Sequence, residues 1–317
     1  MISVRRYSDK ETEQWNEFNE KSKNSLFMFN RAYMDYHKDR FMDHSLMFYD
    51  DDSIIALLPM SQHEDILISH GGLTYGGFIS NSNMKQHTMN ECFDLLVDYA
   101  SNHKFYKIRY KTIPHIYHSQ SAEEDRYALY AHGGNLITVD ASTYLNLLNP
   151  LKMSKGRKAQ ISRARRENVV VKQVEDYDSY YSFIALENEV LVKRHNTQAV
   201  HTAKELKMLH DAFPDRIHLF NAYKNGRIVA GTVIYEYEHV IHTQYMAANE
   251  EARKLGALDL VINTVIDKYK VNKKWLDFGI STEHDKIFLN EGLISQKEGF
   301  GGRTGVYEIW ELPISVK

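Results

Sequence analysis

The 317-residue chain contains one cysteine and five prolines, and it has no long run of apolar residues. A single cysteine, Cys92, cannot form a disulfide within the chain and excludes metal sites built from several thiolates. It precedes Phe93 in an amphipathic segment with no base close in sequence, so we expect it to be packed rather than nucleophilic. Without a run of about 18 apolar residues or an apolar N-terminal segment, the sequence predicts a cytoplasmic protein with no stable membrane insertion.

The charge of the chain is balanced, which limits the partners that it can bind. Its 39 basic and 42 acidic side chains give a formal net charge of −3 with histidine neutral. A protein that coats nucleic acid through its overall charge is therefore excluded, and any polyanion site has to be local. Hydrophobic residues make up 43% of the chain and aromatic residues 12%, enough for a sizeable core in one large domain or two smaller ones.

The order of predicted strands and helices repeats in the two halves of the chain. In the first half, two strands joined by a turn at 50–53 are followed by a third strand, an amphipathic helix and a fourth strand. The helix is indicated by apolar side chains at helical spacing: Met89, Phe93, Leu96, Val97 and Ala100. The strands are predicted at 45–49, 54–58, 66–68 and 106–110.

The second half has the same order, and its hairpin is a strong local signal. Asn225-Gly226 is typical of the two-residue turn that joins antiparallel strands. The strands are predicted at 218–223, 227–234, 241–246 and 275–278, with a helix at 258–269 before the last strand. Two unrelated α+β halves would also show this order, so the pattern alone leaves both a repeat and a coincidence open.

A basic segment lies between the two halves. Residues 152–166 contain seven basic side chains and no acidic one, and their composition predicts a helix after Gly156. A strand at 169–171 and helices at 180–194 and 203–212 are predicted to follow. The basic side chains suit a tRNA acceptor stem, the pyrophosphate of a nucleotide-linked precursor, or water alone. The acidic balance of the rest of the chain favours the last two over a long polyanion.

The segment 249–259 resembles the acyl-CoA pyrophosphate loop of GNAT acetyltransferases. That loop reads Gln or Arg, two residues, Gly, any residue, then Gly or Ala, and it matches here at Arg253 and Gly256. Free N–H groups at a helix N-terminus bind an anion, and glycine permits its close approach. The resemblance implies a donor site at Arg253, Lys254, Gly256 and Ala257, although Leu258 departs from the pattern at its last position. An ordinary glycine turn before a core helix is the alternative.

The C-terminal segment 292–302 resembles the Gly-Leu-Tyr-x-Phe-Lys-x-x-Phe-Gly-Gly segment of the Fem transferases, with Gln296 in place of an aromatic residue. The basic segment also resembles the start of the second Fem domain. Fem transferases build peptidoglycan bridges from aminoacyl-tRNA and consist of two fused GNAT-like domains. The resemblance therefore implies an α+β fold, an α/β sandwich, with tandem GNAT-like domains at 1–150 and 151–317. Each would be a mixed, mostly antiparallel sheet flanked by helices.

Polar residues on and after the predicted strands of the second half are the candidates for catalysis. Glu283 follows the last strand and suits a general base, and His284 would assist it. Gln244 and Tyr245 lie on the third strand and suit the polarisation of an acyl carbonyl. For each of these residues taken singly, a structural role such as a helix cap is the alternative.

Charged and aromatic residues elsewhere are candidates for binding the acceptor. Lys297 is the first residue carried over from the resemblance, as a cation for a phosphate or carboxylate, with a solvated lysine as the alternative. The other candidates are Arg40, Arg194, His195 and Tyr75. Tyr75 lies in a segment with four glycines in seven residues, which indicates either a β-bulge or a ligand close to the backbone.

The histidines do not predict a metal site, although the chain has 16 of them. His239 and His242 are three residues apart on a predicted strand, where side chains at that spacing point to opposite faces. No HExxH pattern occurs in the sequence. We therefore expect no metal.

The residues and the resemblance together predict an N-acyltransferase that moves an acyl or aminoacyl group to an amine of a cell-envelope or polysaccharide precursor. The donor stays open between acyl-CoA and aminoacyl-tRNA, with tRNA not favoured, and the acceptor is expected to be a small or nucleotide-linked molecule. One alternative is an acetyl-CoA-dependent GNAT N-acetyltransferase acting on a small molecule or an amino sugar. The other is a GNAT-like binding module without activity, in which Leu258 marks a loop that no longer holds a donor.

Overall fold

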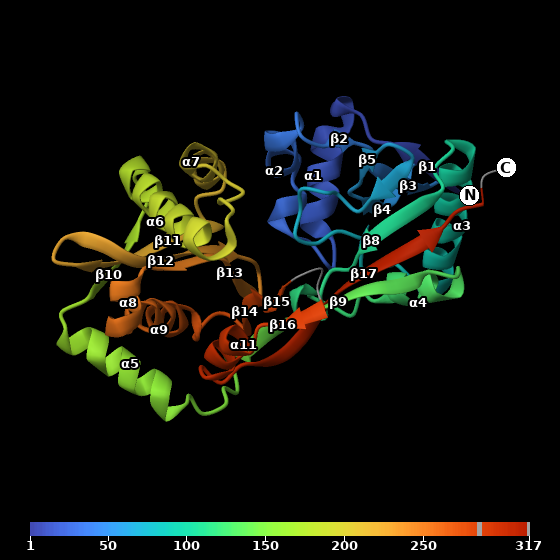
Figure 1. Cartoon of the computed structure of the whole chain (residues 1–317). Coiled ribbons are helices and arrows are strands. Elements are labelled where there is room, and N and C mark those ends of the chain that lie inside the picture. The colour runs from blue at the N-terminus through green and yellow to red at the C-terminus, as the bar shows by residue number, and fades with distance from the viewer. Residues whose placement is uncertain (284–286, 316–317) are drawn as a thin grey trace. The chain divides into compact units, whose positions relative to one another are not determined.

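The computed structural model describes residues 1–283 and 287–315, without the side chains of Arg194 and His195 (Figure 1). The chain forms two compact units. Unit 1 comprises Met1–Asp140 and the C-terminal segment from Val306, and unit 2 comprises Ala141–Gly305. The sequence predicted one boundary at residue 150. The structure differs because the last strand pairs with a strand of the first half and so belongs to unit 1.

Unit 2 contains a mixed sheet in the order β10-β11-β12-β13-β14-β9. Its strands are β10 (Val170–Val174), β11 (Ile217–Lys224), β12 (Arg227–Glu236), β13 (Val240–Ala248), β14 (Trp275–Ile280) and the second part of β9 (Asn135–Asn146). All neighbours are antiparallel except β13 and β14, which are parallel. The predicted hairpin turn is present, with positive φ at both Asn225 and Gly226.

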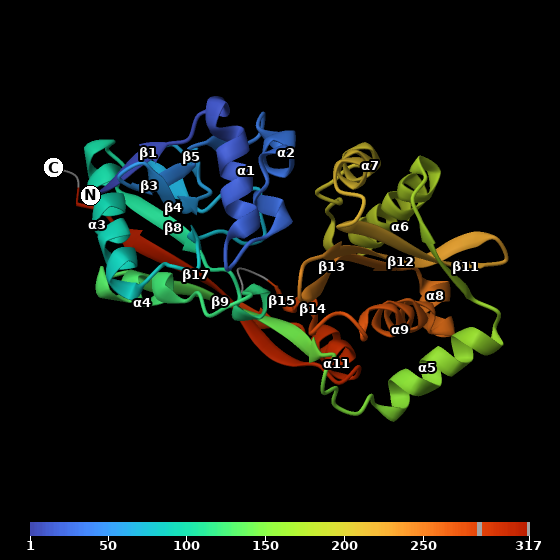
Figure 2. The ribbon, with the colours of Figure 1, turned by 180° about the vertical axis from the view of Figure 1, so that it is seen from behind.

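The helices of unit 2 cover both faces of this sheet. They are α5 (Lys155–Arg166), α6 (Tyr177–His195), α7 (Ala203–Ala212), α8 (Glu250–Leu255), α9 (Ala257–Tyr269) and α11 (Glu291–Glu298), with a small hairpin of β15 (Thr282–Glu283) and β16 (Phe288–Leu289). Figures 1 and 2 show α6 and α7 on one side of the sheet and α5, α8 and α9 on the other. Buried Val261 and Val265 of α9 share one core with Ala230 and Leu276 of the sheet.

Unit 1 contains two sheets. One has the order β1-β3-β4-β7, and the other has the order β17-β8-β6-β5-β2. The strands are β1 (Ile2–Arg6), β2 (Met42–Asp43), β3 (Leu46–Asp50), β4 (Ser53–Leu58), β5 (Ser61–His63), β6 (Ile66–Ile68), β7 (Ile79–Ser80), β8 (Lys107–Lys111) and β17 (Arg303–Pro313). The helices are α1 (Thr12–Lys21), α2 (Arg31–Met34), α3 (Gln86–Asn102) and α4 (Glu124–Ala131), with 3₁₀ turns η1 (Asp9–Glu11), η2 (Phe27–Phe29), η3 (Asp35–His37) and η4 (His115–Tyr117).

The predicted repeat of strand and helix order is present in the two units. In unit 1, β4 and β5 lie between antiparallel neighbours, and β6 is followed by the additional strand β7, by α3 and then by its parallel neighbour β8. In unit 2, β12 has the same surroundings, and β13 is followed by α8 and α9 and then by its parallel neighbour β14. Each unit therefore has one pair of parallel neighbours reached through a helical connection.

The glycine-rich segment of unit 1 is an excursion between two strands of different sheets. β6 pairs Ile68 with Ser61, and β7 pairs Ile79 with Leu57, so the excursion spans residues 69–78. Lys111 Nζ donates to the carbonyls of His70 and Leu73 and holds this excursion in place. A Cβ at Gly72 would lie 2.1 Å from the His37 ring, so side-chain packing within unit 1 accounts for glycine here.

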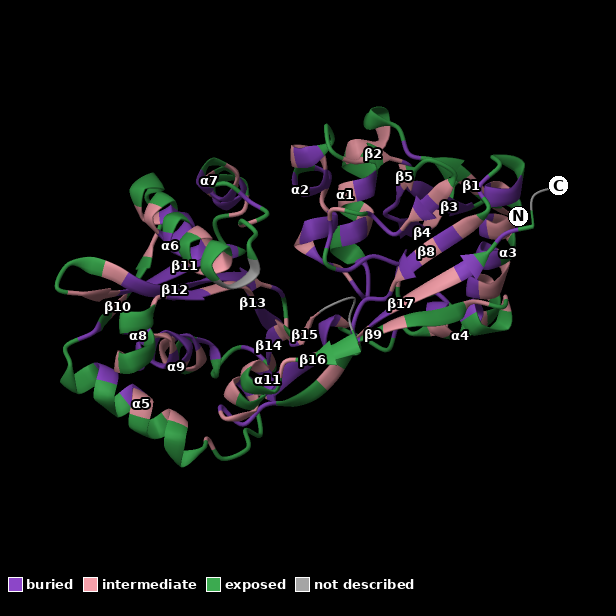
Figure 3. Cartoon of the chain, viewed as in Figure 1, coloured by how far each residue is buried: buried purple, intermediate pink, exposed green. Residues whose placement is uncertain are grey.

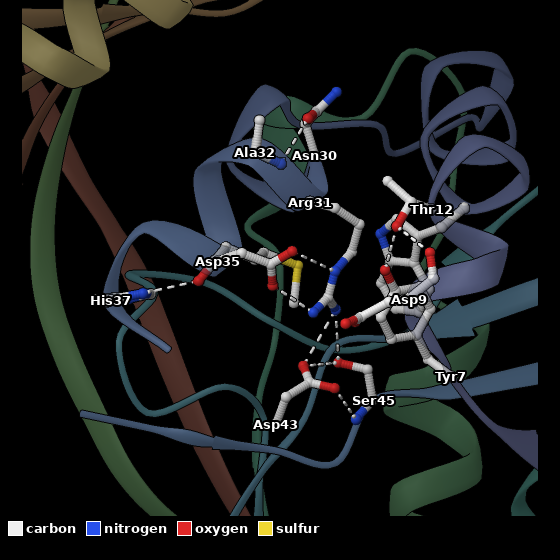
Figure 4. A network of polar contacts seen from close by, with 12 residues as sticks. Tyr7, Asp9, Thr12, Asn30, Arg31, Ala32, Asp35, His37, Asp43 and Ser45 are labelled. Atoms are coloured by element: carbon white, nitrogen blue, oxygen red, sulfur yellow. Dashed lines mark hydrogen bonds and ion pairs between the residues drawn. The ribbon is translucent and has the colours of Figure 1, made fainter. Parts of the chain in front are cut away.

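A buried arginine joins α2 to the strands of unit 1 (Figure 4). Arg31 is 2% exposed, and its guanidinium pairs with Asp35 at 2.5 Å and with Asp43 at 3.1 Å. The guanidinium also lies 3.9 Å from the centre of the Tyr7 ring. Removing one member of such a group leaves a charge buried without compensation, so the cluster fixes the position of α2.

A buried carboxyl in unit 1 makes the stability of the protein depend on pH. Burial raises the pKa of Asp125 to about 6, and the Tyr110 hydroxyl donates to its Oδ2 at 2.6 Å. The folded carboxyl therefore binds its proton more tightly than the unfolded one, and the free energy of unfolding falls as pH rises from about 4 to about 6. We expect Asp125→Asn to remove this fall. The free energy of unfolding of the variant, relative to that of wild type, should therefore rise by on the order of 3 kcal/mol from pH 4 to pH 7.

Urea unfolding at pH 4 and pH 7 measures this effect. The exposed turn residue Asp52 provides the control, because Asp52→Asn should leave the pH dependence of wild type intact. An Asp125→Asn variant that loses stability between these pH values as steeply as wild type would contradict the prediction.

Candidate active site

The two parallel strands of unit 2 separate after three residues. β13 pairs with β14 only from Val240 to His242, opposite Trp275 to Asp277. Beyond this point β13 stays with β12, while β14 bends at Gly279, which has a φ of +70°. The Asp277 carboxylate fixes the bend by accepting hydrogen bonds from the Ser142 hydroxyl at 2.8 Å and the Gly279 amide at 2.9 Å. A gap therefore opens between the C-terminal ends of the strands.

A β-bulge lies on β13 where this gap begins. Val233 pairs with Tyr245 and Ile234 with Thr243, so Gln244 is the extra residue. The side-chain oxygens Gln244 Oε1 and Thr243 Oγ1 are buried and have no hydrogen-bond partner among the described residues. Bulges and buried polar atoms without partners are typical of ligand sites. Gln244, a predicted catalytic residue, thus lies beside the gap.

Tyr245 lies on the face of the sheet that α6 covers. Its register partner Val233 is two residues from Gly231, and a Cβ at Gly231 would lie 2.8 Å from Phe183 of α6. The Tyr245 hydroxyl shares a hydrogen bond with Nδ1 of buried His201, which precedes α7. A hydroxyl held by an imidazole can pass or receive a proton, so the arrangement suits proton transfer in addition to the predicted polarisation of a carbonyl.

A pocket of about 530 Å³ occupies this region of unit 2. Its apolar wall includes Val190, Leu191, Met246, Ile262, Phe278 and Leu293. These side chains come from α6 on one face of the sheet, from α9 and α11, and from the two separated strands. The pocket therefore combines an apolar wall, which suits a small acyl group, with polar and charged side chains from α5, α8, α9 and α11.

The predicted donor loop is present at the start of α9, but α5 packs against it. Gly256 lines the pocket with a φ of +75°, and a Cβ there would lie 2.5 Å from the Gln160 carbonyl oxygen of α5. The Lys254 carbonyl accepts a hydrogen bond from Arg163 of α5, and Ala257 is fully buried. Glycine is required at position 256 because the α5 backbone lies close to it. From the sequence, a ligand had been predicted to occupy this space.

An ion pair also lies in the first turn of α9. The carboxylate of buried Asp259 is 2.7 Å from the Arg157 guanidinium of α5, and both residues line the pocket. Burial raises the pKa of Asp259, and Arg157 partly offsets this. The positive helix N-terminus and one cation of the basic helix thus face a carboxylate of the chain itself. Figure 3 shows the rest of α5 largely exposed.

Lys297 also lines the pocket but is only 3% exposed. Its Nζ donates to the carbonyls of Gly279 and Ile280 at 2.8 and 2.6 Å and to the Ser281 hydroxyl at 2.9 Å. Burial lowers the pKa of Lys297 to about 8. The lysine holds the bent end of β14, and its three N–H groups all have partners in this arrangement.

The other predicted residues fall in three groups. Glu283 lines the pocket, and its Oε1 accepts a hydrogen bond from Asn290 at 2.7 Å. His284 and the side chains of Arg194 and His195 lie outside the described residues. Arg40 and Tyr75 belong to unit 1 and do not line this pocket. Arg40 is exposed beside the Tyr36 ring, and the Tyr75 hydroxyl bonds to those of Tyr117 and Tyr307.

Sequence reasoning missed two acidic residues of unit 2, Asp259 and Glu187. Glu187 is 6% exposed, and burial raises its pKa to about 7. It follows Phe183 by four residues and therefore continues the apolar stripe of α6, where a glutamate is unusual. This break in the apolar pattern was readable from the sequence, whereas the pairing of Asp259 with Arg157 depends on the tertiary structure.

Comparison with known proteins connects this site to an enzyme family. Residues 154–286 match the model of an acetyltransferase (GNAT) domain. This segment is a GNAT acyltransferase domain. A search among curated proteins found no match to the chain.

Solved structures match nearly the whole chain, beyond the segment of the GNAT domain. FemX covers 96% of both chains with 12% identity and a TM-score of 0.66. The structure of L-PGS from Bacillus licheniformis covers 96% of this chain and 92% of that one, with 14% identity and a TM-score of 0.65. A tandem GNAT protein from the clavulanic acid biosynthesis pathway covers both chains fully, with 8% identity and a TM-score of 0.56. These likenesses confirm the predicted α+β tandem fold.

Within residues 1–283 and 287–315, no helix is long and apolar enough to cross a membrane. In the same part of the chain, no three His, Cys, Asp or Glu side chains are placed to hold a metal ion together.

Proposed function

We propose that the protein transfers an acyl or aminoacyl group to an amine, with the acyl group bound in the pocket of the GNAT domain. The observation that supports this most is the pocket itself, which lies where β13 and β14 separate beside the bulge at Gln244. The acyl carbonyl would lie near this bulge, and Tyr245 and Glu283 would be available for proton transfer. As the resemblance implies, the acceptor would be an amine on a cell-envelope or polysaccharide precursor.

The activated acyl group can come from a thioester or from an aminoacyl ester. A coenzyme A donor would need free backbone N–H groups for its pyrophosphate at the start of α9. There, α5 approaches Gly256, and the Asp259 carboxylate would repel a phosphate. The residues present do not fit a pyrophosphate at this loop, which favours a donor such as an aminoacyl ester. The exposed basic side chains of α5 would then be available to its nucleic-acid part.

A transfer assay with two donor classes tests the proposal. The protein is incubated with acyl-CoA thioesters or with aminoacyl-tRNA, each with amino sugars and nucleotide-linked muropeptide precursors, and the amide product is detected by mass spectrometry. We expect product with at least one donor. We also expect Leu293→Trp, which fills the pocket, to reduce the transfer rate at least about tenfold, a cost of about 1.4 kcal/mol in transition-state binding.

Met208→Trp is the matched control, because Met208 is half exposed on α7 and does not line the pocket. It should transfer at the rate of wild type. Thermal shift measures donor binding separately, since a ligand at 100 times its dissociation constant adds about 2.7 kcal/mol of stability. Absence of both product and donor binding would contradict the proposal and favour a binding module without activity. Loss of transfer after Ala replaces Lys155, Lys158, Arg165 and Arg166 would support the aminoacyl-tRNA donor.

A further inference from the structure

One face of α6 connects the centre of the unit 2 sheet to the pocket. Phe183 lies against Gly231 of β12, and Val190 and Leu191 line the pocket. Glu187 lies between them, four residues after Phe183 and three to four before the pocket residues, on the same side of the helix. Helical side chains lean toward the N-terminus, so those of Val190 and Leu191 cover the turn that holds Glu187. Glu187 therefore lies one helical turn from two residues that line the pocket.

Glu187 is buried, and one of its carboxylate oxygens has no partner among the described residues. The residue is 6% exposed, and the oxygen without a hydrogen bond is Oε2. Burial raises the pKa of Glu187 to about 7, with no contribution from a charge of the described residues. Two histidines near α6 bond elsewhere: His210 of α7 bonds to the Ile217 carbonyl, and His201, just before α7, bonds to Tyr245 of β13. A buried carboxyl in this state is usually retained for a ligand.

We propose that Glu187 receives the amine of the acceptor and takes its proton before acyl transfer. This inference rests on the proposed function and deepens it, because it identifies an acidic subsite for a primary ammonium group on the α6 side of the pocket. Gln244 Oε1, the buried oxygen at the bulge of β13, would accept a hydrogen bond from one of the remaining N–H groups. The subsite therefore selects a cationic acceptor.

The chemistry balances without a further reactant. The ammonium gives one proton to the Glu187 carboxylate and becomes a neutral amine. Its lone pair forms a C–N bond to the acyl carbon, and the bond from that carbon to the ester oxygen or thioester sulfur breaks. The second amine proton goes to this leaving group, which departs as an alcohol or thiol. Glu187 then releases its proton to water and is ready for the next cycle.

The test compares the pH profiles of wild type and Glu187→Gln in the transfer assay. For wild type we expect kcat/KM to rise with pH through an apparent pKa near 7, since only the carboxylate accepts the proton. Glu187→Gln should lose this limb and transfer about 100 times more slowly at pH 7.5, with donor binding by thermal shift unchanged. Glu187→Asp, which keeps the carboxylate, should recover part of the rate. Glu189→Gln, an exposed change on the same helix, should match wild type.

The outcomes separate this inference from the proposed function. One outcome is that wild type transfers the acyl group and Glu187→Gln does so at a rate within threefold of it, with the rise of kcat/KM near pH 7 still present. This would overturn the role of Glu187 and leave the proposed function standing. Absence of transfer by wild type overturns both. If the glutamine variant does not fold, the pH profile of Glu187→Asp provides the test. A shift in the pH at which its kcat/KM rises supports the role of Glu187, and a profile equal to that of wild type overturns it.

Discussion

Replacing Lys297 with methionine is expected to lower the free energy of unfolding by about 3 kcal/mol and to abolish acyl transfer. The methionine would fill the volume, but the Gly279 and Ile280 carbonyls and the Ser281 hydroxyl would lose their donor. Each buried acceptor left without a partner costs about 1–3 kcal/mol. The bent end of β14 would then relax, and the pocket wall around Phe278 with it. Urea unfolding and the transfer assay measure the two effects.

A second signature of Lys297 is its pH dependence. Burial lowers its pKa to about 8, so the unfolded lysine binds its proton more tightly than the folded one. The free energy of unfolding therefore contains a contribution that rises with pH from about 8 to about 10.5, and Lys297→Met should lack it. Lys270→Met is the control, because Lys270 is exposed with one surface ion pair and its loss should cost less than about 0.5 kcal/mol. Equal unfolding curves for the two variants would contradict the structural role of Lys297.

Gly256→Ala is expected to destabilise the protein by about 3–4 kcal/mol. Part of this cost comes from the φ of +75°, which disfavours any residue with a Cβ by about 1–2 kcal/mol. The rest comes from the Gln160 backbone of α5, which a Cβ would meet at 2.5 Å. Because backbone atoms cannot yield as a flexible side chain can, α5 would have to move away from the start of α9. Urea unfolding and donor binding of the variant measure this change.

Gly226→Ala separates the two contributions. Gly226 has almost the same backbone conformation, with a φ of +78°, and nothing lies within 4 Å of its missing Cβ. This variant should therefore lose only about 1 kcal/mol, the conformational part. Equal losses for Gly226→Ala and Gly256→Ala would show that α5 does not approach Gly256 closely. A Gly256 variant that folds with full stability but fails to bind a donor would instead restore the ligand argument for this glycine.

Local signals predicted most of the framework. The turn at Asn225-Gly226 and the spacing of apolar residues around Phe93 each act within a few residues of the chain, and α7 begins and ends where the sequence placed it. The short α8 was not predicted as a separate helix, because only the left-handed conformation of Gly256 divides it from α9. The return of β17 to β8 depends on pairing across about 200 residues, which no local pattern encodes.

The site was predicted less completely than the fold. Gln244 and Glu283 were identified from residue type and Lys297 from the resemblance, and all three lie at or beside one pocket. Their contacts were not predictable: the three partners of Lys297 exist only because β14 bends at Gly279. The approach of α5 to Gly256 is likewise a tertiary contact, and it changes the reason for that glycine from anion binding to helix packing.

The pairing of β17 with β8 has a consequence for synthesis on the ribosome. Residues 141–305 form a continuous stretch, so unit 2 can fold as soon as it has left the exit tunnel. Unit 1 leaves the tunnel first, yet β8 keeps an open edge until Ile309 to Pro313 have been translated. While about 200 further residues are added, the nascent chain exposes the open edge of β8. During this interval the chain depends most on a chaperone to prevent pairing with other strands.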